Sequence, residues 1–136
     1  MAGGKGEGSA LNQLNYPGGI ALDAAGDLLI ADSHNHRVVK WAAGATQGIV
    51  AAGGNGEGSS LNQLHSPRYV AIDAAGSIFV ADRNNARIVK WAPDAAEGQV
   101  VAGGHGEGEG LDQLNWPWGI ALVQVTQRIT AASHKI

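Results

Sequence analysis

The sequence PGGIALDAAGDLLIADSHNHRVVKW, at residues 17–41, is the most informative about the fold because it recurs as PRYVAIDAAGSIFVADRNNARIVKW at residues 67–91. The preceding loop also recurs, as AGGKGEGSALNQL from Ala2, AGGNGEGSSLNQL from Ala52 and AGGHGEGEGLDQL from Ala102. The period is 50 residues without a gap, and the first two copies share 28 identities in 50 aligned positions. A period of about 40 to 50 residues indicates propeller blades when strands fill it.

Each complete repeat has the pattern of four short strands. In the first copy, alternating or continuous apolar runs predict strands at residues 19–23, 27–32, 37–41 and 48–52. Gly26 lies in the turn between the first two, where a positive φ is expected. We expect one helical turn at residues 11–14 and no longer helix. The predicted fold class is all-β: a partial, open β-propeller with two full blades of four antiparallel strands and an incomplete third.

The repeats define one domain over residues 1–136, with repeat 1 at 2–51, repeat 2 at 52–101 and a partial, divergent repeat 3 at 102–136. Copy three departs after Leu122, and Val123 and Thr126 replace the aspartate and the turn glycine of the other copies. A natural divergent end, a truncation or an altered reading frame would each give such a tail. Ala131, Ser133 and His134 match Ala31, Ser33 and His34, so we expect the strand register to survive.

The recurring residues closely resemble the NHL repeat, a β-propeller blade. They are Pro17, Ile20, Asp23, Gly26, Ala31, Asp32, Asn35, Arg37 and Val38, and in copy two Pro67, Val70, Asp73, Gly76, Ala81, Asp82, Asn85, Arg87 and Ile88. The resemblance implies a binding platform for protein and, in some members, for RNA. It also leaves an enzymatic alternative, because some similar propellers are lyases or hydrolases with metal-binding residues in the central channel.

Composition narrows the possible functions. Cysteine is absent, which excludes disulfides, thiol catalysis and cysteine-based metal sites. The net charge is −3, so nucleic acid is not an expected partner. No apolar run approaches the roughly 18 residues of a membrane span, and the N-terminal stretch lacks the apolar core of a signal peptide. The sequence does not indicate in which cellular compartment the protein lies.

Two repeated polar triads are interpreted as structural staples. Asp32, Asn35 and Arg37 flank one turn, and Asp82, Asn85 and Arg87 occupy the same positions in copy two. A carboxylate and an arginine in this arrangement can form a charge-assisted hydrogen bond. Their repetition favours a role in holding each blade together over the alternative, a calcium or substrate site.

The remaining motifs do not predict catalysis or a cofactor. GGKGEG and its copies lack the flanking helix and the lysine pattern of phosphate-binding loops. Zinc needs three or four converging ligands, whereas His34 and His36 become Asn84 and Ala86 in copy two. No serine-histidine-aspartate spacing occurs. We predict no catalytic residue, no metal and no cofactor.

Residues that differ between copies are the expected interaction surface. Tyr16, Arg68, Tyr69, Trp116 and Trp118 flank the proline before the innermost strand of each blade. Tyrosine, tryptophan and arginine are enriched in interface hot spots. The alternative is that these side chains pack between neighbouring blades.

The function predicted from these observations is a non-catalytic protein-interaction or scaffold module. Two and a half blades do not close a ring, so we expect a second copy or another protein subunit to cover the open ends. The alternatives are a propeller enzyme with a metal-assisted site in an assembled ring and a small structural subunit of a larger complex.

Overall fold

The computed structural model describes residue 4 and residues 6–104, 117–123 and 128–133, the last two segments by their backbone course. These described residues form ten strands and two single-turn 3-10 helices, η1 (Ser33–Asn35) and η2 (Arg83–Asn85). The first sheet contains β1 (Pro17–Leu22), β2 (Leu28–Asp32), β3 (Arg37–Trp41) and β4 (Ile49–Gly53). The second contains β5 (Pro67–Ile72), β6 (Ile78–Asp82), β7 (Arg87–Trp91) and β8 (Gln99–Gly103). The third pairs β9 (Pro117–Val123) with β10 (Arg128–Ser133).

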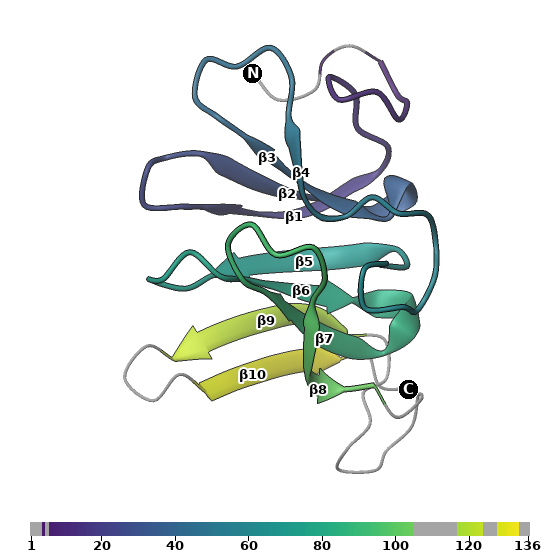
Figure 1. Ribbon diagram of the computed structural model, residues 1–136, viewed down its shortest axis with the longest axis vertical. Coiled ribbons are helices and arrows are strands. Elements are labelled where there is room, and N and C mark those ends of the chain that lie inside the picture. The colour runs from purple at the N-terminus through teal and green to yellow at the C-terminus, as the bar shows by residue number, and fades with distance from the viewer. Residues whose placement is uncertain (1–3, 5, 105–116, 124–127, 134–136) are drawn as a thin grey trace.

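The three sheets are stacked, with β1 and β5 at the junction of the first two (Figure 1). Every neighbouring pair of strands is antiparallel and follows chain order. We call the two four-stranded sheets blade 1 and blade 2. The prediction of an all-β fold with two full four-stranded blades and an incomplete third sheet is confirmed. The described part of the chain contains no helix that is long and apolar enough to cross a membrane.

The hairpin turn between the first two strands has the same construction in both blades. Asp23 Oδ1 accepts hydrogen bonds from the amides of Ala25 and Asp27, each at 2.9 Å. Gly26 has a φ of +86°, and Gly76 has a φ of +88° in blade 2. This backbone region is strained for residues with a Cβ. The predicted positive φ at the turn glycine is confirmed.

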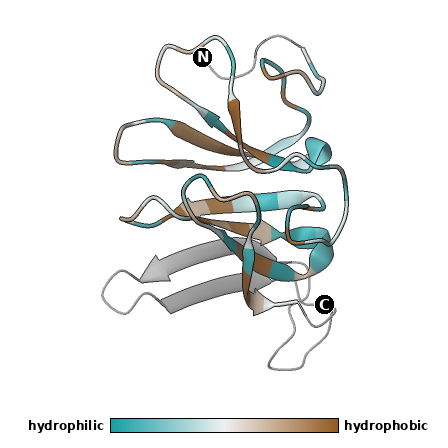
Figure 2. Cartoon of the chain, in the orientation of Figure 1, coloured by the Kyte–Doolittle hydropathy of each residue, from teal (hydrophilic) through white to brown (hydrophobic). Residues whose placement is uncertain are grey.

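The main apolar core lies between the two blades. Leu29, Val38 and Ala52 of blade 1 share a cluster with residues of blade 2 that include Val80 and Val89. Figure 2 shows the hydrophobic colouring concentrated on the strands rather than on the connecting loops. The middle strands of each blade are buried on both faces, which explains their nearly continuous apolar sequence.

Glycines allow the inner strands of the two blades to approach closely. A Cβ on Gly18 would lie 2.5 Å from the carbonyl oxygen of Arg68, and one on Gly19 would lie 2.4 Å from Tyr69 Cδ1. Ser33 Oγ also donates a hydrogen bond to the carbonyl oxygen of Pro67. The junction is therefore joined by close backbone packing and by a hydrogen bond from blade 1 to blade 2.

Two details of the sequence prediction were wrong. Residues 11–14 form a hydrogen-bonded turn and a bridge to Glu7 rather than a helical turn, while the helical turns follow β2 and β6. In the third sheet Ile120 pairs with Ala131, whereas the equivalent Ile20 pairs with Ile30. The pairing of β10 with β9 is therefore shifted by one residue relative to the pairing of β2 with β1.

Candidate interaction site at the junction of the blades

The polar triad of blade 1 is buried at the end of β2. Asp32 Oδ1 accepts from the amide of Asn15 at 2.7 Å, and Asp32 Oδ2 accepts from Asn35 Nδ2 at 2.9 Å and from Arg37 Nε at 2.8 Å. The other guanidinium nitrogens of Arg37 donate to carbonyl oxygens of the preceding loop, those of Ser9, Ala10 and Gln13. The three side chains grouped by the sequence analysis are thus in direct contact, and they bind the loop to the blade.

Blade 2 repeats this network. Asp82 Oδ2 accepts from Asn85 Nδ2 and Arg87 Nε, each at 2.8 Å, and Oδ1 accepts from the amide of His65 at 2.7 Å. Burial raises the pKa of Asp82, and the hydrogen bonds from His65, Asn85 and Arg87 oppose that increase. Because the donors and acceptors of these triads bind one another and nearby backbone, they offer little to an external ligand.

A groove of about 310 Å³ lies beside the triads, at the end of the blades where β1 and β5 begin. We call it the rim groove. Both blades contribute to it, and its lining residues are Tyr16, Ser33, His34, Ser66, Arg68, Arg83 and Asn84. The structure therefore brings together Tyr16 and Arg68, two of the residues predicted to form an interaction surface.

An aromatic pair forms one wall of the rim groove. The rings of Tyr16 and His34 are stacked, with centroids 4.6 Å apart and an angle of 9° between their planes. Tyr16 is 62% exposed, and its φ of +59° is unusual for a residue with a side chain. Ser66, at the same repeat position, has a φ of +53°. This shared backbone conformation places residues 16 and 66 at the mouth of the groove.

A second group of aromatic and acidic side chains lies close to the junction. The amide of Ser66 donates to His36 Nδ1 at 3.0 Å, and the His36 ring makes an edge contact with His65. His65 Nε2 lies 2.7 Å from Glu57 Oε1. Burial lowers the pKa of His36, chiefly by destabilising its charged form. The hydrogen bond from Ser66 requires an unprotonated Nδ1 and is consistent with that direction.

Of the other predicted interaction residues, only Tyr69 has a described side chain, and it lies apart from the rim groove. Tyr69 approaches Gly19 across the junction and does not line the groove. Trp118 lies on β9, of which only the backbone is described, and Trp116 lies outside the described residues. Sequence reasoning missed Arg83 and Asn84. Comparison of the copies, which selected Tyr16, could also have found them, because Ser33 and His34 occupy their positions in copy one.

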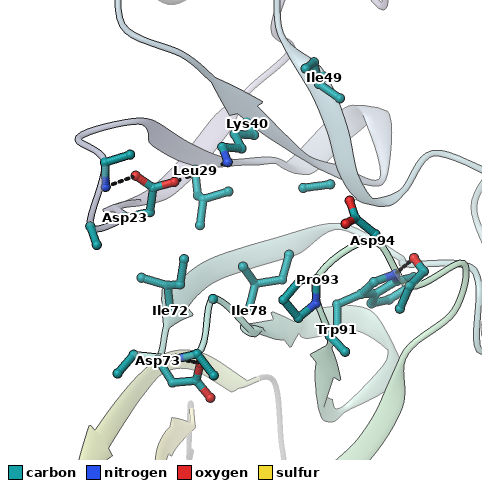
Figure 3. Close-up of a pocket in the computed structure, with 18 of the residues that line it drawn as sticks. Asp23, Leu29, Lys40, Ile49, Ile72, Asp73, Ile78, Trp91, Pro93 and Asp94 are labelled. Carbon is teal, nitrogen blue, oxygen red and sulfur yellow. Dashed lines mark hydrogen bonds and ion pairs between the residues drawn. The ribbon is translucent and has the colours of Figure 1, made fainter.

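A larger groove of about 760 Å³ opens at the opposite end of the same junction, beside the β1–β2 and β5–β6 turns (Figure 3). Ile72, Ile78 and Trp91 line it, and Lys40 Nζ lies 3.4 Å from Asp23 Oδ2 at its edge. The pKa of Asp23 is lowered, mainly by its hydrogen bond from the Asp27 amide. Much of this lining recurs in both repeats, so it resembles the structural frame more than a variable binding surface.

Among the residues that the structure describes, no three histidine or carboxylate side chains are grouped to hold a metal ion. The four-stranded sheets, their stacking and the variable rim define a protein built from β-propeller blades. The NHL repeat family matches residues 14–41 and 64–91, and the chain belongs to that family. No match was found among curated proteins.

Proposed function

We propose that this chain is a non-catalytic protein-interaction module and that the rim groove is its binding surface. The observation that carries the proposal is that the repeated residues hold the blades together, whereas residues that differ between the repeats line the groove. The side chains within each repeated triad bind one another and the backbone, whereas the variable Tyr16 and Arg68 line an open groove. Tyr16 is exposed and Arg68 is half-buried, and tyrosine and arginine are enriched among the residues that anchor protein interfaces.

A display library of random peptides tests this function without assuming a partner. The intact chain is used for selection, and a Tyr16→Ala/Arg68→Ala variant is used to remove peptides that bind elsewhere. We expect enriched peptides whose affinity falls at least about tenfold on the variant, as hot-spot truncation predicts. Failure to enrich any peptide, or equal binding to the variant, would contradict the proposal. Circular dichroism of the variant checks that its fold is retained.

A second interaction is favoured by the free face of blade 1. Ile20 is 62% exposed, whereas Val70, at the same position of blade 2, is 5% exposed and packs in the core between the blades. Leu22 on the same strand is 63% exposed. Exposed apolar side chains at positions that are buried (Val70) or half-buried (Ile72) in blade 2 support association with a second copy or with another protein subunit.

Sedimentation at micromolar concentration tests self-association. We expect the wild-type chain to form a species larger than 13.9 kDa, and Ile20→Glu to shift it toward the monomer because the new charge would be buried in the contact. Lys90→Gln, a substitution on a different strand, is the control. A well-folded wild-type monomer throughout this range would reject self-association and leave a different subunit as the partner.

A further inference from the structure

We propose that the larger groove, beside the β1–β2 and β5–β6 turns, binds an extended segment of a protein partner. The segment carries an apolar and a basic side chain on the same side. We call this groove the turn groove. It lies at the opposite end of the junction from the rim groove, and its assignment does not depend on the function proposed for the rim groove. Variable lining residues, the charges of the lining and the open edge of β4 support it.

Two lining positions of the turn groove change their chemical character between the repeats, although most of the lining is shared. Ile49 on β4 corresponds to Gln99 in repeat 2, and Asp94, in the loop after β7, corresponds to Gly44 in repeat 1. Figure 3 shows Ile49 on the blade 1 side of the groove and Asp94 on the blade 2 side. Each blade therefore contributes one residue that the common repeat does not require, one apolar and one acidic.

The turn that carries Asp94 does not need a carboxylate. Asp94 has a φ of +60°, and Gly44, at the same position of repeat 1, has a φ of +77°. Glycine adopts this backbone region without the strain that a Cβ adds, so the turn forms at least as easily without the aspartate. The side chain is exposed, and among the described residues no hydrogen bond or ion pair engages its carboxylate. Its negative charge is therefore available at the edge of the groove.

The charges of the lining favour a basic ligand. The lining contains the carboxylates of Asp23, Asp73 and Asp94 and the ammonium group of Lys40. Lys40 Nζ lies 3.4 Å from Asp23 Oδ2, so these two charges largely compensate each other. Asp73 Oδ1 accepts hydrogen bonds from two amides of its own turn, which gives this side chain a structural role. The groove as a whole is negative, and Asp94 is the carboxylate best placed to pair with a lysine or arginine of a partner.

Apolar side chains supply the second part of the recognition. Ile78 and Trp91 form a buried apolar part of the lining from blade 2, while Ile49 and Val50 of β4 are 67% and 38% exposed. A partner that covers these side chains removes apolar surface from water. The aliphatic stem of a lysine or arginine can lie along such a surface while its charge reaches a carboxylate. At about 760 Å³, the groove has room for more than one side chain.

The open edge of β4 favours an extended peptide as the occupant. One edge of β4 pairs with β3, and in the described part of the chain no strand pairs with the other. Alternate residues of an antiparallel strand direct their N–H and C=O groups away from the partner strand, and an added peptide strand can bind such groups. Side chains two positions apart on an extended segment point to the same side. An apolar and a basic residue at that spacing therefore match the apolar lining and Asp94.

A display library of random peptides tests the turn groove when the rim groove is disabled. The target is the full chain carrying Tyr16→Ala and Arg68→Ala, and counter-selection uses the same protein with Val50→Ser and Asp94→Asn added. Asparagine is chosen because it tolerates the left-handed backbone at position 94. We expect enriched peptides that carry an apolar residue two positions from a lysine or arginine. Circular dichroism checks that each variant is folded.

Matched variants of the otherwise wild-type chain then measure each contact with the most enriched peptide. Val50→Ser should weaken binding at least about tenfold, whereas Val100→Ser, at the equivalent and similarly exposed position of β8, should change it less than about twofold. Asp94→Asn should weaken binding about twofold to fivefold, as for an exposed ion pair. Glu97→Gln removes the same charge from the same loop and should have less than about a twofold effect. Replacing the basic residue of the peptide by glutamine should abolish the effect of Asp94→Asn.

The outcomes separate this inference from the function proposed for the rim groove. Enriched peptides without a basic residue, or an affinity that Asp94→Asn leaves unchanged, would overturn it. Normal binding by folded Val50→Ser would also overturn it, and Ile49→Ser replaces that variant if Val50→Ser does not fold. If the rim-disabled chain enriches no peptide, the turn groove is not a binding site. Peptides that bind the wild-type chain and depend on Tyr16 and Arg68 would then support the rim groove alone.

Discussion

Arg37 Nε lies 2.8 Å from Asp32 Oδ2, and the remaining nitrogens of this guanidinium donate to three backbone carbonyl oxygens of the loop before the blade. Both side chains are buried. Removing one member of such a pair leaves an uncompensated buried charge, which is far more destabilising than loss of an exposed ion pair. The stability of each blade therefore depends on the polar side chains of its triad.

Replacing the triad arginine of blade 2 tests this dependence. We expect Arg87→Ala to lower the free energy of unfolding by about 3–5 kcal/mol, because Asp82 and the carbonyl oxygens of Ser59, Ser60 and Gln63 lose their donors. Guanidinium denaturation measures the loss. The control, Lys90→Ala on the same strand, should change stability by less than about 1 kcal/mol. A loss below about 1 kcal/mol for Arg87→Ala would show that the staple is dispensable.

The histidine that binds Ser66 should make stability depend on pH. Because burial lowers the pKa of His36 below its usual 6.5, the unfolded chain binds a proton more readily than the folded chain. The contribution of His36 is present in full above pH 6.5 and declines as the pH falls toward its folded pKa. We expect the denaturation midpoint to decrease as the pH is lowered from 6.5 toward the folded pKa of His36.

His36→Asn isolates that contribution because asparagine tolerates the left-handed backbone, where His36 has a φ of +52°. The difference between wild type and variant removes the effect of groups present in both, including the raised pKa of Asp82. We expect a flatter stability profile below pH 6.5 for the variant. Parallel profiles would mean that His36 has the same pKa in the folded and unfolded chains.

Gly98 tests the tight packing of the loop before β8. A Cβ there would lie 2.3 Å from Val89 Cγ1 and 2.7 Å from Trp91 Cε3, so Gly98→Ala should destabilise by roughly 1–3 kcal/mol through overpacking. Gly26→Ala is the comparison, since its Cβ would meet nothing within 4 Å and would add only the strain of a φ of +86°, about 1 kcal/mol. Thermal unfolding ranks the two. Equal destabilisation would argue against a close contact at Gly98.

The two blades offer a matched pair of apolar substitutions. Val70→Ala should cost roughly 2 kcal/mol of stability, because the side chain is 5% exposed in the core between the blades. Ile20→Ala, at the equivalent position, should cost less than about 0.5 kcal/mol at low protein concentration, where association is weak. Denaturant unfolding across a concentration series measures both. Similar costs at the lowest concentration would mean that Ile20 is covered within the monomer.

Much of the fold follows from the period of the sequence. The expected strand at residues 37–41 is observed as Arg37–Trp41, and the other strands of blade 1 begin and end within two residues of their predicted bounds. These positions are predictable because apolar patterning and turn residues act locally. The register of β10 was not predictable in this way, because copy three departs from the repeat after Leu122 and the pattern of the earlier copies no longer specifies how β10 pairs.

The candidate site was only partly accessible from the sequence. Comparison of the copies selected Tyr16 and Arg68, which line the rim groove. The same comparison marks Arg83 as a variable residue, but it does not show that Arg83 lies beside Tyr16, since a residue on the turn after β6 meets the start of β1 only through the packing of two blades. The hydrogen bonds from Arg37 to the loop carbonyl oxygens were also not predictable, because the spacing of residues in the sequence does not specify the path of a loop.

The rim groove exists only while the two blades are docked. Each triad, by contrast, closes within its own repeat, where Arg37 reaches back 28 residues to Ser9. Any ligand that contacts Tyr16 on one blade and Arg68 on the other therefore binds the docked arrangement and not the separated blades. Thermodynamic linkage then requires such a ligand to strengthen blade docking, so partner binding and the cohesion of the domain become a single coupled equilibrium.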